Sequence, residues 1–349
     1  MEKQSVVISQ QLEQVLSEAI AQCKPDLIFI LTDETTRMLC LPAVSALACV
    51  AQAQSITIAA GDTHKNLEAV SHVWSELQRM GATRHSLLIN LGGGMVTDLG
   101  GFAASTFKRG IHFINIPTTL LAMVDASVGG KTGINFGGLK NEIGVFQNAD
   151  CVILDTLFLQ TLDEENILSG YAEMLKHGLI STEAHWAELM NFDIEHPDLD
   201  ALGRLVAKSV QVKEHIVTED PTEKGIRKAL NLGHTIGHAF ESLALKRKPV
   251  LHSYAVAWGM VCELYLSSMK TGFPVDKMRQ TVRFIMDHYG RMPVTCDDYP
   301  TLLELMTHDK KNTGHDINFT LLGGIGDIRI NQTATKQDIE EVLDFYREG

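Results

Sequence analysis

The sequence has few of the features that mark secreted, membrane or nucleic-acid-binding proteins. Its six cysteines are scattered along 349 residues without a Cys-x-x-Cys pair, which argues against a disulfide framework or a thiolate zinc site and for a reducing compartment. No basic region leads into an apolar signal core at the N-terminus. The longest apolar stretch, 250–269, contains His252 and Glu263, so we expect a buried helix there and not a membrane span. The expectation is a cytoplasmic protein.

Positive charge is also scarce. Against 43 Asp and Glu there are 30 Lys and Arg, and the net charge of −13 disfavours nucleic acid or an anionic membrane as a partner. Some of the cations nevertheless lie beside glycines, histidines or carboxylates, and these predict a small anionic ligand, although lysines in solvent are the alternative. They are Lys131, Lys140, Lys176, Lys213, Arg227 and Lys310.

The first half of the chain alternates short apolar runs with segments of helical spacing. Strands are expected at 26–33, 55–60, 86–91 and 111–116, and a helix at 67–80. Continuous apolar strands that alternate with helices are typical of a parallel sheet covered on both faces.

From about residue 163 helical spacing dominates, with one β-like run at 317–322. We therefore predict an α/β N-terminal Rossmann-like nucleotide-binding domain (1–162) and an all-α C-terminal metal-binding domain (163–349), with the active site in the cleft between them. The expected C-terminal helices are 164–180, 182–190, 199–219, 227–245, 254–270, 276–288, 302–308 and 336–348.

Two histidines, His234 and His238, are spaced four apart, which on a helix places both imidazoles on one face. With His252 and the carboxylate of Glu173 they indicate a metal site with a position open to water or substrate. Solvated or hydrogen-bonded histidines on a helix are the alternative.

Two glycine-rich stretches suggest contacts with phosphate. Gly92-Gly93-Gly94 follows an expected strand and opens a helix, so it would let a phosphate approach backbone amides, or would form a tight turn with positive φ angles. Thr118 and Thr119 end the next strand and could face the same ligand or cap a helix. The stretch 125–135 resembles a Walker loop, but Asp125 stands where that motif needs glycine, so we reject an NTPase interpretation.

Four polar residues lie on one predicted helix face. Arg227, Asn231, His234 and His238 are spaced four, three and four, so a continuous helix would align a guanidinium, an amide and two imidazoles. We expect such a stripe to bind an anion and a metal, and a polar face in solvent is the alternative.

In this order, the motifs resemble those of the 3-dehydroquinate synthase family, within the sugar-phosphate cyclases. The resemblance spans most of the chain. The matching stretches are 92–98, 101–104, 109–110, 117–121, 124–131, 140–141, 170–176, 227–241 and 309–311.

The resemblance implies a homodimeric enzyme of the shikimate pathway, which leads to chorismate and the aromatic amino acids. Its reaction converts 3-deoxy-D-arabino-heptulosonate 7-phosphate to 3-dehydroquinate and phosphate by transient oxidation with NAD, phosphate elimination, re-reduction, ring opening and intramolecular aldol cyclisation. The enzyme would be an NAD- and metal-dependent carbon–oxygen lyase. A small anionic sugar phosphate would be its partner, with no nucleic acid or membrane involved.

The family pattern also assigns site residues. The implied ligands of Zn²⁺ (or Co²⁺) are Glu173, His234 and His252, which leaves His238 as a polar or proton-transfer group. The implied NAD contacts are Asp33, Asp62, Lys65, Gly94, Met95, Val96, Thr97, Asp98, Thr118, Thr119, Asp125, Lys131, Lys140, Phe158, Leu159, Gln160 and Thr161. The implied substrate-binding and catalytic residues are Lys131, Asn141, Lys176, Lys213, Glu223, Arg227, Asn231, His238 and Lys310, with Arg109 reaching into a partner subunit's site.

Three positions in two segments depart from the family pattern. Ser253 and Tyr254 follow His252 where the family has Gly and Glu, and Asp62 replaces a Glu, so the surroundings of His252 are open to question. Rival hypotheses are a cyclase acting on sedoheptulose 7-phosphate or a glucose 6-phosphate-like substrate, a metal- and NAD-dependent polyol dehydrogenase, and a catalytically inactive NAD-binding protein. Retention of Arg227, Asn231, His238 and Lys310 favours the dehydroquinate reaction.

Overall fold

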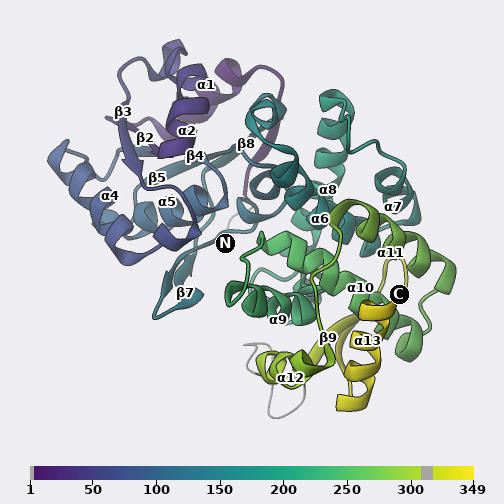
Figure 1. Cartoon of the computed structure of the whole chain (residues 1–349). Helices are drawn as coiled ribbons and strands as arrows, with labels where there is room; N and C mark the ends of the chain where they lie inside the picture. Colours follow the sequence, from purple (N-terminus) through teal and green to yellow (C-terminus); the bar gives the residue numbers. More distant parts are fainter. Residues whose placement is uncertain (1–3, 308–316) are drawn as a thin grey trace. The chain divides into compact units, whose positions relative to one another are not determined.

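The computed structural model describes residues 4–307 and 317–349 (Figure 1). The chain divides into two compact units, Met1–Ile167 and Leu168–Gly349, which we call the α/β unit and the helical unit. Within the described ranges, none of the helices combines the length and hydropathy that a bilayer crossing requires.

The α/β unit is built on a six-stranded parallel sheet of order β1-β8-β5-β4-β2-β3. Every residue of β4 and β8 is buried, so both faces of the sheet's centre are covered, as predicted. The four expected strands are confirmed as β2 to β5, whereas β1 and β8 were not predicted. The strands are β1 (Val6–Ser9), β2 (Ile28–Asp33), β3 (Gln54–Ile58), β4 (Leu87–Gly92), β5 (His112–Pro117) and β8 (Cys151–Asp155).

Helices between the strands cover this sheet. In α4, Val70, Val73 and Leu77 are buried at helical spacing, and Asn66 caps its first turn by accepting a hydrogen bond from the Ala69 amide. Gly100 lets α5 approach β4, because a Cβ there would lie 2.0 Å from Asn90 Oδ1. The helices are α1 (Leu12–Cys23), α2 (Glu34–Leu39), α3 (Leu41–Ser45), α4 (Leu67–Arg79) and α5 (Gly94–Thr106).

Beyond the sheet, the α/β unit carries an antiparallel hairpin of β6 (Lys131–Phe136) and β7 (Leu139–Phe146). The stretch 125–135, expected as a glycine-rich loop, is instead a turn of π-helix (Ala122–Ala126) followed by strand β6. Gly137 and Gly138, both with positive φ, make the connection to β7, whose residues are all exposed.

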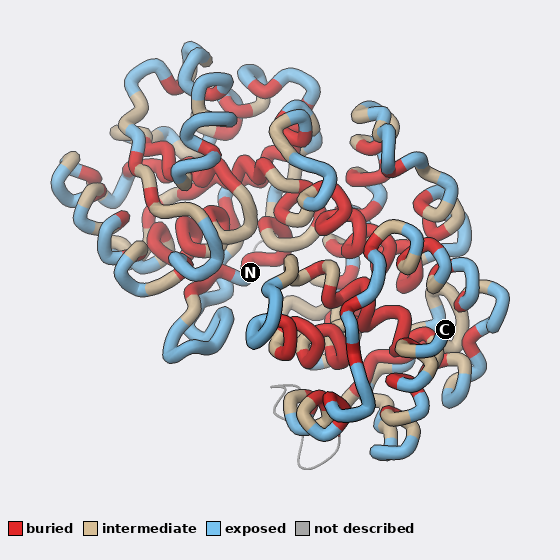
Figure 2. Tube along the Cα trace, in the orientation of Figure 1, coloured by how far each residue is buried: buried red, intermediate tan, exposed pale blue. Residues whose placement is uncertain are grey.

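The helical unit contains most of the expected helices and a small antiparallel hairpin. The β-like run is confirmed as β9 (Asn318–Gly324), whose partner β10 (Asp327–Thr333) was not predicted. Figure 2 shows buried segments concentrated inside the unit and exposed segments around them. The helices are α6 (Glu164–Leu179), α7 (Glu183–Met190), α8 (Leu199–Glu219), α9 (His234–Leu245), α10 (His252–Thr271), α11 (Val275–Tyr289), α12 (Tyr299–Thr307) and α13 (Lys336–Glu348).

The predicted continuous helix over 227–245 is wrong. The chain forms a short 3₁₀ helix, η6 (Ile226–Asn231), and then breaks at Gly233, where φ is 80°, before α9 begins. The buried carboxylate of Glu263 on α10 accepts hydrogen bonds from the amides of Gly233 (2.6 Å), Thr235 (3.0 Å) and Ile236 (3.2 Å). A carboxylate at this position caps the helix and complements its dipole, which stabilises the break.

Glycines bring α9 and α10 into close contact. A Cβ on Gly259 would lie 2.0 Å from the Gly233 carbonyl oxygen, and a Cβ on Gly237 would lie 2.9 Å from the Ala255 carbonyl oxygen. No larger residue fits between the two backbones at these points. This packing determines the spacing between the histidines at the start of α9 and the histidine that begins α10.

Candidate active site

The predicted NAD-binding residues of the α/β unit follow the carboxyl ends of five parallel strands. Asp33 ends β2, Asp62 and Lys65 follow β3, Gly94 follows β4, and Thr118 and Thr119 follow β5. The 3₁₀ turn Thr156–Thr161, which contains Phe158, Leu159, Gln160 and Thr161, follows β8. The carboxyl edge of a parallel sheet is where such folds bind nucleotides.

The start of α5 has the form of an anion-binding helix terminus. Gly93 is the N-cap residue and makes no side-chain cap, so the first amides of this helix of 13 residues have no capping side chain. The alternative interpretation of 92–94 as a tight turn with positive φ angles is wrong, because none of Gly92, Gly93 and Gly94 has a positive φ. Their small size matters instead, since a Cβ on Gly93 would lie 3.1 Å from Thr119 Cγ2.

Two of the predicted cofactor residues, Lys65 and Asp98, form a charged network with Asn141, a predicted substrate-binding residue. The buried Lys65 ammonium lies 2.5 Å from Asp98 Oδ2 and donates to Asn141 Oδ1 at 2.5 Å. On the hairpin, Lys140 Nζ lies 3.3 Å from Asp62 Oδ2, so the shorter Asp62 still forms an ion pair. These contacts link the loop after β3 to α5 and to the β6–β7 hairpin.

Asp125, Lys131 and Arg109 lie in three further segments of the same unit. Asp125 is in the π-helical turn, Lys131 begins β6 with an exposed side chain, and Arg109 follows α5 with φ of 72°. Met95, Val96 and Thr97 are in the first turn of α5 with Asp98 after them, and Val96 and Thr97 are buried.

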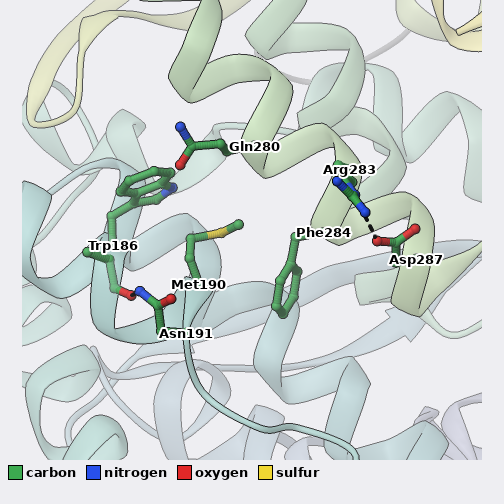
Figure 3. A pocket seen from close by; sticks show the side chains of 8 residues that line it. Trp186, Met190, Asn191, Gln280, Arg283, Phe284 and Asp287 are labelled. Carbon is green, nitrogen blue, oxygen red and sulfur yellow. Dashed lines mark hydrogen bonds and ion pairs between the residues drawn. The ribbon is translucent and has the colours of Figure 1, made fainter.

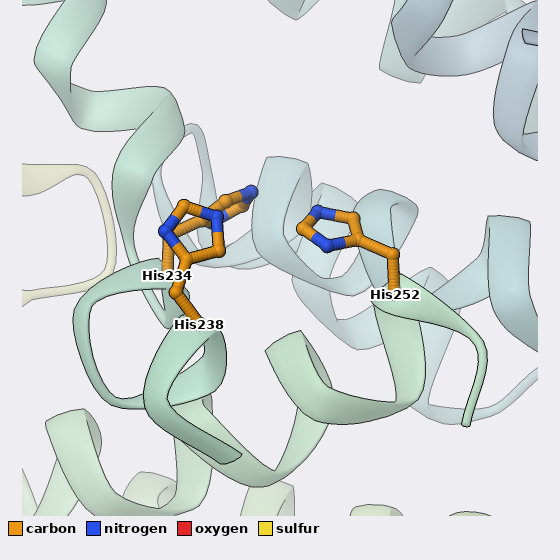
Figure 4. Close-up of side chains that lie close together, drawn as sticks. All are labelled: His234, His238 and His252. Carbon is orange, nitrogen blue, oxygen red and sulfur yellow. The ribbon is translucent and has the colours of Figure 1, made fainter. Parts of the chain in front are cut away.

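In the helical unit, three imidazoles converge (Figure 4). His234 and His238 project from α9 and His252 from the start of α10, and one ligand nitrogen of each lies within 4.8 Å of the others. The ring centroids are 5.4 to 5.6 Å apart. We call these three residues the histidine group.

Hydrogen bonds orient two of the three rings. His252 Nδ1 lies 2.9 Å from Glu241 Oε2, and His234 Nδ1 lies 3.1 Å from the Leu232 carbonyl oxygen. Each contact engages Nδ1 and leaves Nε2 as the nitrogen for a metal, which is the usual arrangement around zinc-binding histidines. Glu241 thus supplies a carboxylate to His252 although the family's Glu after that histidine is absent. The signal in the sequence was the spacing of three between His238 and Glu241, which places both side chains on one face of α9.

The carboxylate of Glu173 lies beside this group on α6. Its side chain is fully buried, with Oε1 3.9 Å from His234 Nε2, and within the described chain no donor hydrogen-bonds to that oxygen. The other oxygen, Oε2, forms an ion pair with the buried Lys176. A buried carboxylate oxygen without a donor is costly, and a divalent cation beside His234 would compensate it. These donors fit a zinc or cobalt ion.

The predicted substrate-binding cations of this unit are unusually buried. Lys176, Lys213 and Arg227 are 1%, 5% and 2% exposed, and they lie on α6, α8 and η6. The Arg227 guanidinium donates to the Pro221 carbonyl oxygen at 2.7 Å. Buried cations of this kind are rare unless they have anionic partners, which is consistent with a binding site for carboxylate and phosphate.

The predicted single stripe of Arg227, Asn231, His234 and His238 is wrong, because the break at Gly233 separates the first two from α9. Asn231 instead donates to Glu223 Oε1 at 2.8 Å. This contact joins Asn231 to Glu223, another predicted catalytic residue. Lys310 and Lys311 lie outside the described residues.

A separate hollow of about 370 Å³ lies between α7 and α11 (Figure 3). Trp186, Met190 and Phe284 line it, together with the ion-paired Arg283 and Asp287. None of the predicted site residues lines it, so the hollow supplies no part of the chemistry argued above.

Solved structures share this fold. A 2-epi-5-epi-valiolone synthase from Streptomyces hygroscopicus, with NAD⁺ and Zn²⁺ bound, matches with a TM-score of 0.86 and 25% identity, covering 100% of this chain and 98% of that one. A 2-deoxy-scyllo-inosose synthase complexed with carbaglucose-6-phosphate, NAD⁺ and Co²⁺ has the same TM-score at 21% identity, covering 99% and 96%. At 11–15% identity, the neighbours include alcohol dehydrogenases and maleylacetate reductases, with TM-scores from 0.67 to 0.72.

Sequence relatives are more specific. A 3-dehydroquinate synthase from Parabacteroides distasonis is 56% identical over 350 residues, covering 100% of this chain and 99% of the relative. One from Streptococcus pneumoniae is 39% identical over 293 residues, covering 82% and 79%. Residues 55–169 match the model of the 3-dehydroquinate synthase N-terminal domain and residues 170–312 that of the C-terminal domain. The chain therefore belongs to the 3-dehydroquinate synthase family.

Proposed function

We propose that this chain converts 3-deoxy-D-arabino-heptulosonate 7-phosphate to 3-dehydroquinate and phosphate, as a carbon–oxygen lyase that recycles NAD. The observation that carries the proposal is 56% identity along the whole chain to a 3-dehydroquinate synthase. The two cyclases with other substrates are only 21% and 25% identical. The histidine group and the buried Glu173 provide the site chemistry.

Glu173, His234 and His252 would hold a zinc or cobalt ion. The imidazole rings of His234 and His252 are oriented by Leu232 and Glu241, and Glu173 brings a negative charge next to His234. When bound, the metal would polarise a substrate oxygen, and NAD would accept a hydride from the substrate and return it. Structural relatives hold NAD⁺ with Zn²⁺ or Co²⁺, which supports both cofactors here.

His238 has a different role in this proposal. It lies one helical turn after His234, in the same group, and its imidazole can hold or move a proton of the substrate. Three histidine ligands without Glu173 would be the alternative metal set. The orphaned oxygen of Glu173 favours the carboxylate set, because Lys176 engages only Oε2, and a buried Oε1 without a donor is costly unless a cation compensates it.

The other residues bind and orient the substrate. Lys176, Lys213 and Arg227 would bind its carboxylate and phosphate through charge-assisted hydrogen bonds. Asn231 is oriented by its bond to Glu223, so its amide is positioned for a hydroxyl. Lys131, Asn141 and, from a partner subunit, Arg109 complete the set, and Lys310 stays a prediction.

The NAD site would use the carboxyl edge of the parallel sheet. The amides at the start of α5 would bind the pyrophosphate, and the network of Lys65, Asp98 and Asn141 would hold the surrounding loops. We further propose that the enzyme works in the cytoplasm as a homodimer in the biosynthesis of aromatic amino acids.

The test measures the release of phosphate from 3-deoxy-D-arabino-heptulosonate 7-phosphate by the purified protein, supplied with NAD and with Zn²⁺ or Co²⁺. We expect one phosphate per 3-dehydroquinate, no net NADH and loss of activity with a chelator. Sedoheptulose 7-phosphate, assayed in parallel, should release little phosphate. Absence of phosphate release from the acid would overturn the proposal, and net NADH accumulation would identify a polyol dehydrogenase.

His252→Ala tests the metal set in the same assay. It should lower kcat by roughly 1000-fold or more, since a Lewis acid contributes several kcal/mol of transition-state stabilisation, and should lower bound metal to a small fraction. His196→Ala, at an exposed histidine of the same unit, is the matched control. Unchanged metal content in His252→Ala would remove that residue from the ligand set.

A further inference from the structure

A second cluster of metal-binding residue types lies in the α/β unit. Cys23 ends α1, His112 begins β5 and Asp150 directly precedes β8. One candidate ligand atom of each residue lies within 4.8 Å of the others. None of these residues belongs to the site already described.

The location separates this cluster from the NAD-binding residues. His112 and Asp150 lie at the amino ends of β5 and β8, whereas the predicted NAD contacts follow the carboxyl ends of the strands. The two strands are parallel neighbours, so the cluster and the predicted NAD contacts lie at opposite ends of the strands of one sheet. The cluster is therefore independent of the proposed reaction.

Hydrogen bonds hold two of the three residues in place. His112 Nδ1 lies 2.9 Å from Asp150 Oδ1, and Asp150 Oδ2 accepts from the Phe113 amide at 2.9 Å. The Asp150 amide in turn donates to the Phe113 carbonyl oxygen at 2.9 Å. The carboxylate and imidazole are thus preorganised beside the half-buried thiol of Cys23.

The chemistry of the three side chains suits a divalent cation of the zinc class. Thiolate, imidazole and carboxylate are zinc ligands, and bonds of about 2.0–2.3 Å place tetrahedral ligand atoms roughly 3.3–3.8 Å apart. Small side-chain rotations would bring atoms within 4.8 Å to that spacing, because His112 and Asp150 are 43% and 37% exposed.

A nucleophilic Cys–His–Asp arrangement is the competing interpretation, and the surroundings of the thiol oppose it. Burial, with the charges of Asp150 and Cys151, raises the pKa of Cys23 to about 11, so the free thiol is a poor nucleophile near neutral pH. A cation next to the same carboxylate would offset the negative charge that destabilises the thiolate.

We propose that Cys23, His112 and Asp150 form a second metal site, which takes Zn²⁺ or a chemically similar cation and links α1 to the amino ends of β5 and β8. Three protein ligands leave one position for water.

Cobalt provides a selective probe, because thiolate ligation to Co²⁺ gives a charge-transfer absorption in the near ultraviolet. The proposed active-site ligands are carboxylate and imidazole, so this band reports only on a thiolate site. Chelator-stripped full-length protein, titrated with Co²⁺ in the presence of NAD, should show the band and bind two equivalents of cobalt. The double variant His234→Ala/His252→Ala should keep the band and lose one equivalent.

Cys23→Ser should abolish the band and remove one equivalent of Co²⁺, while phosphate release is unchanged. Cys49→Ser is the matched control, because Cys49 is also half-buried with a pKa raised by burial and lies near a carboxylate, Glu13. It should keep the band. His112→Gln, which retains a hydrogen-bond donor toward Asp150, should weaken cobalt binding at least about tenfold. Absence of the band at saturating Co²⁺, or a band that persists in Cys23→Ser, would overturn the proposal.

Discussion

The α/β unit and the helical unit build their parts of the candidate site in different ways. In the α/β unit, the predicted cofactor residues follow successive parallel strands, and strand order alone brings them to one edge of the sheet. In the helical unit, Glu173, His234 and His252 come from three separate helices, which have no shared hydrogen-bonded register to align them. The convergence of the two histidines depends on a break at Gly233, a buried cap from Glu263 and close backbone contact between α9 and α10, while Glu173 Oε1 lies 3.9 Å from His234 Nε2.

This difference predicts that the helical unit is the more sensitive of the two to single substitutions near its site. A sheet edge distributes its geometry over many backbone hydrogen bonds. The helical unit relies on a few buried polar groups, each of which costs more to disrupt.

The largest effect is expected for Glu263→Gln. The carboxylate accepts three backbone amides at the start of α9, and the amide group of Gln would turn a donor toward one of them. We expect the free energy of unfolding of the protein to fall by about 3 kcal/mol, measured by urea denaturation, together with loss of bound metal. Glu304→Gln, at an exposed position on α12, is the control. Equal stabilities of the two variants would contradict the role of the cap.

A smaller effect is expected for Glu241→Gln, which weakens the contact to His252 Nδ1. Metal affinity should fall by roughly 10–100-fold, as when other carboxylate partners of metal-binding histidines are replaced. Competition with a chelator measures it. An unchanged affinity would show that backbone packing alone orients the ring, and the contrast between the units would then rest on packing and not on polar groups.

In the α/β unit, Gly93→Ala should raise the dissociation constant for NAD by roughly tenfold, or about 1.4 kcal/mol. The added methyl group would lie 3.1 Å from Thr119 Cγ2 and crowd the approach to the α5 amides. Calorimetric titration measures the constant. Gly324→Ala, where a Cβ would meet nothing within 4 Å, is the control and should bind NAD normally. If Gly93→Ala weakened NAD binding far more than tenfold, the proposed difference in sensitivity between the two units would be contradicted.

The smallest effect concerns pH. Burial lowers the pKa of His185, with Lys208 adding to the shift and Glu188 opposing it. A histidine with a depressed folded-state pKa binds protons more readily when the protein is unfolded, so its stabilising contribution is lost as pH falls below its ordinary value of about 6.5. His185→Gln should therefore show a shallower loss of unfolding free energy than the native chain between about pH 7.5 and 5.5. Parallel curves for the two proteins would contradict this assignment.

The parts of the fold that the sequence predicts are those with local periodicity. The strands β2 to β5 and the helix α4 follow from apolar runs and spacing, and the parallel sheet follows from their alternation. The β6–β7 hairpin was missed although Gly137-Gly138 is a typical two-residue turn, because β7 is exposed along its whole length and has no buried face.

Prediction fails where a partner distant in sequence decides the local structure. The spacing of 227–245 is helical, and the break becomes favourable only because Glu263, 30 residues after Gly233, caps the new helix end. In the same way the spacing of His234 and His238 predicts a pair, whereas the position of Glu173 beside His234 is decided by tertiary folding.

The glycine contacts between α9 and α10 have a consequence for divergence within the fold. Because Gly233, Gly237 and Gly259 place main chain against main chain, the span between the first residues of these helices is independent of the surrounding side chains. Substitutions elsewhere can then reshape a neighbouring substrate pocket without altering that span. A fold built on such a fixed frame can keep one ion-binding geometry while the sugars that it accepts change over evolutionary time.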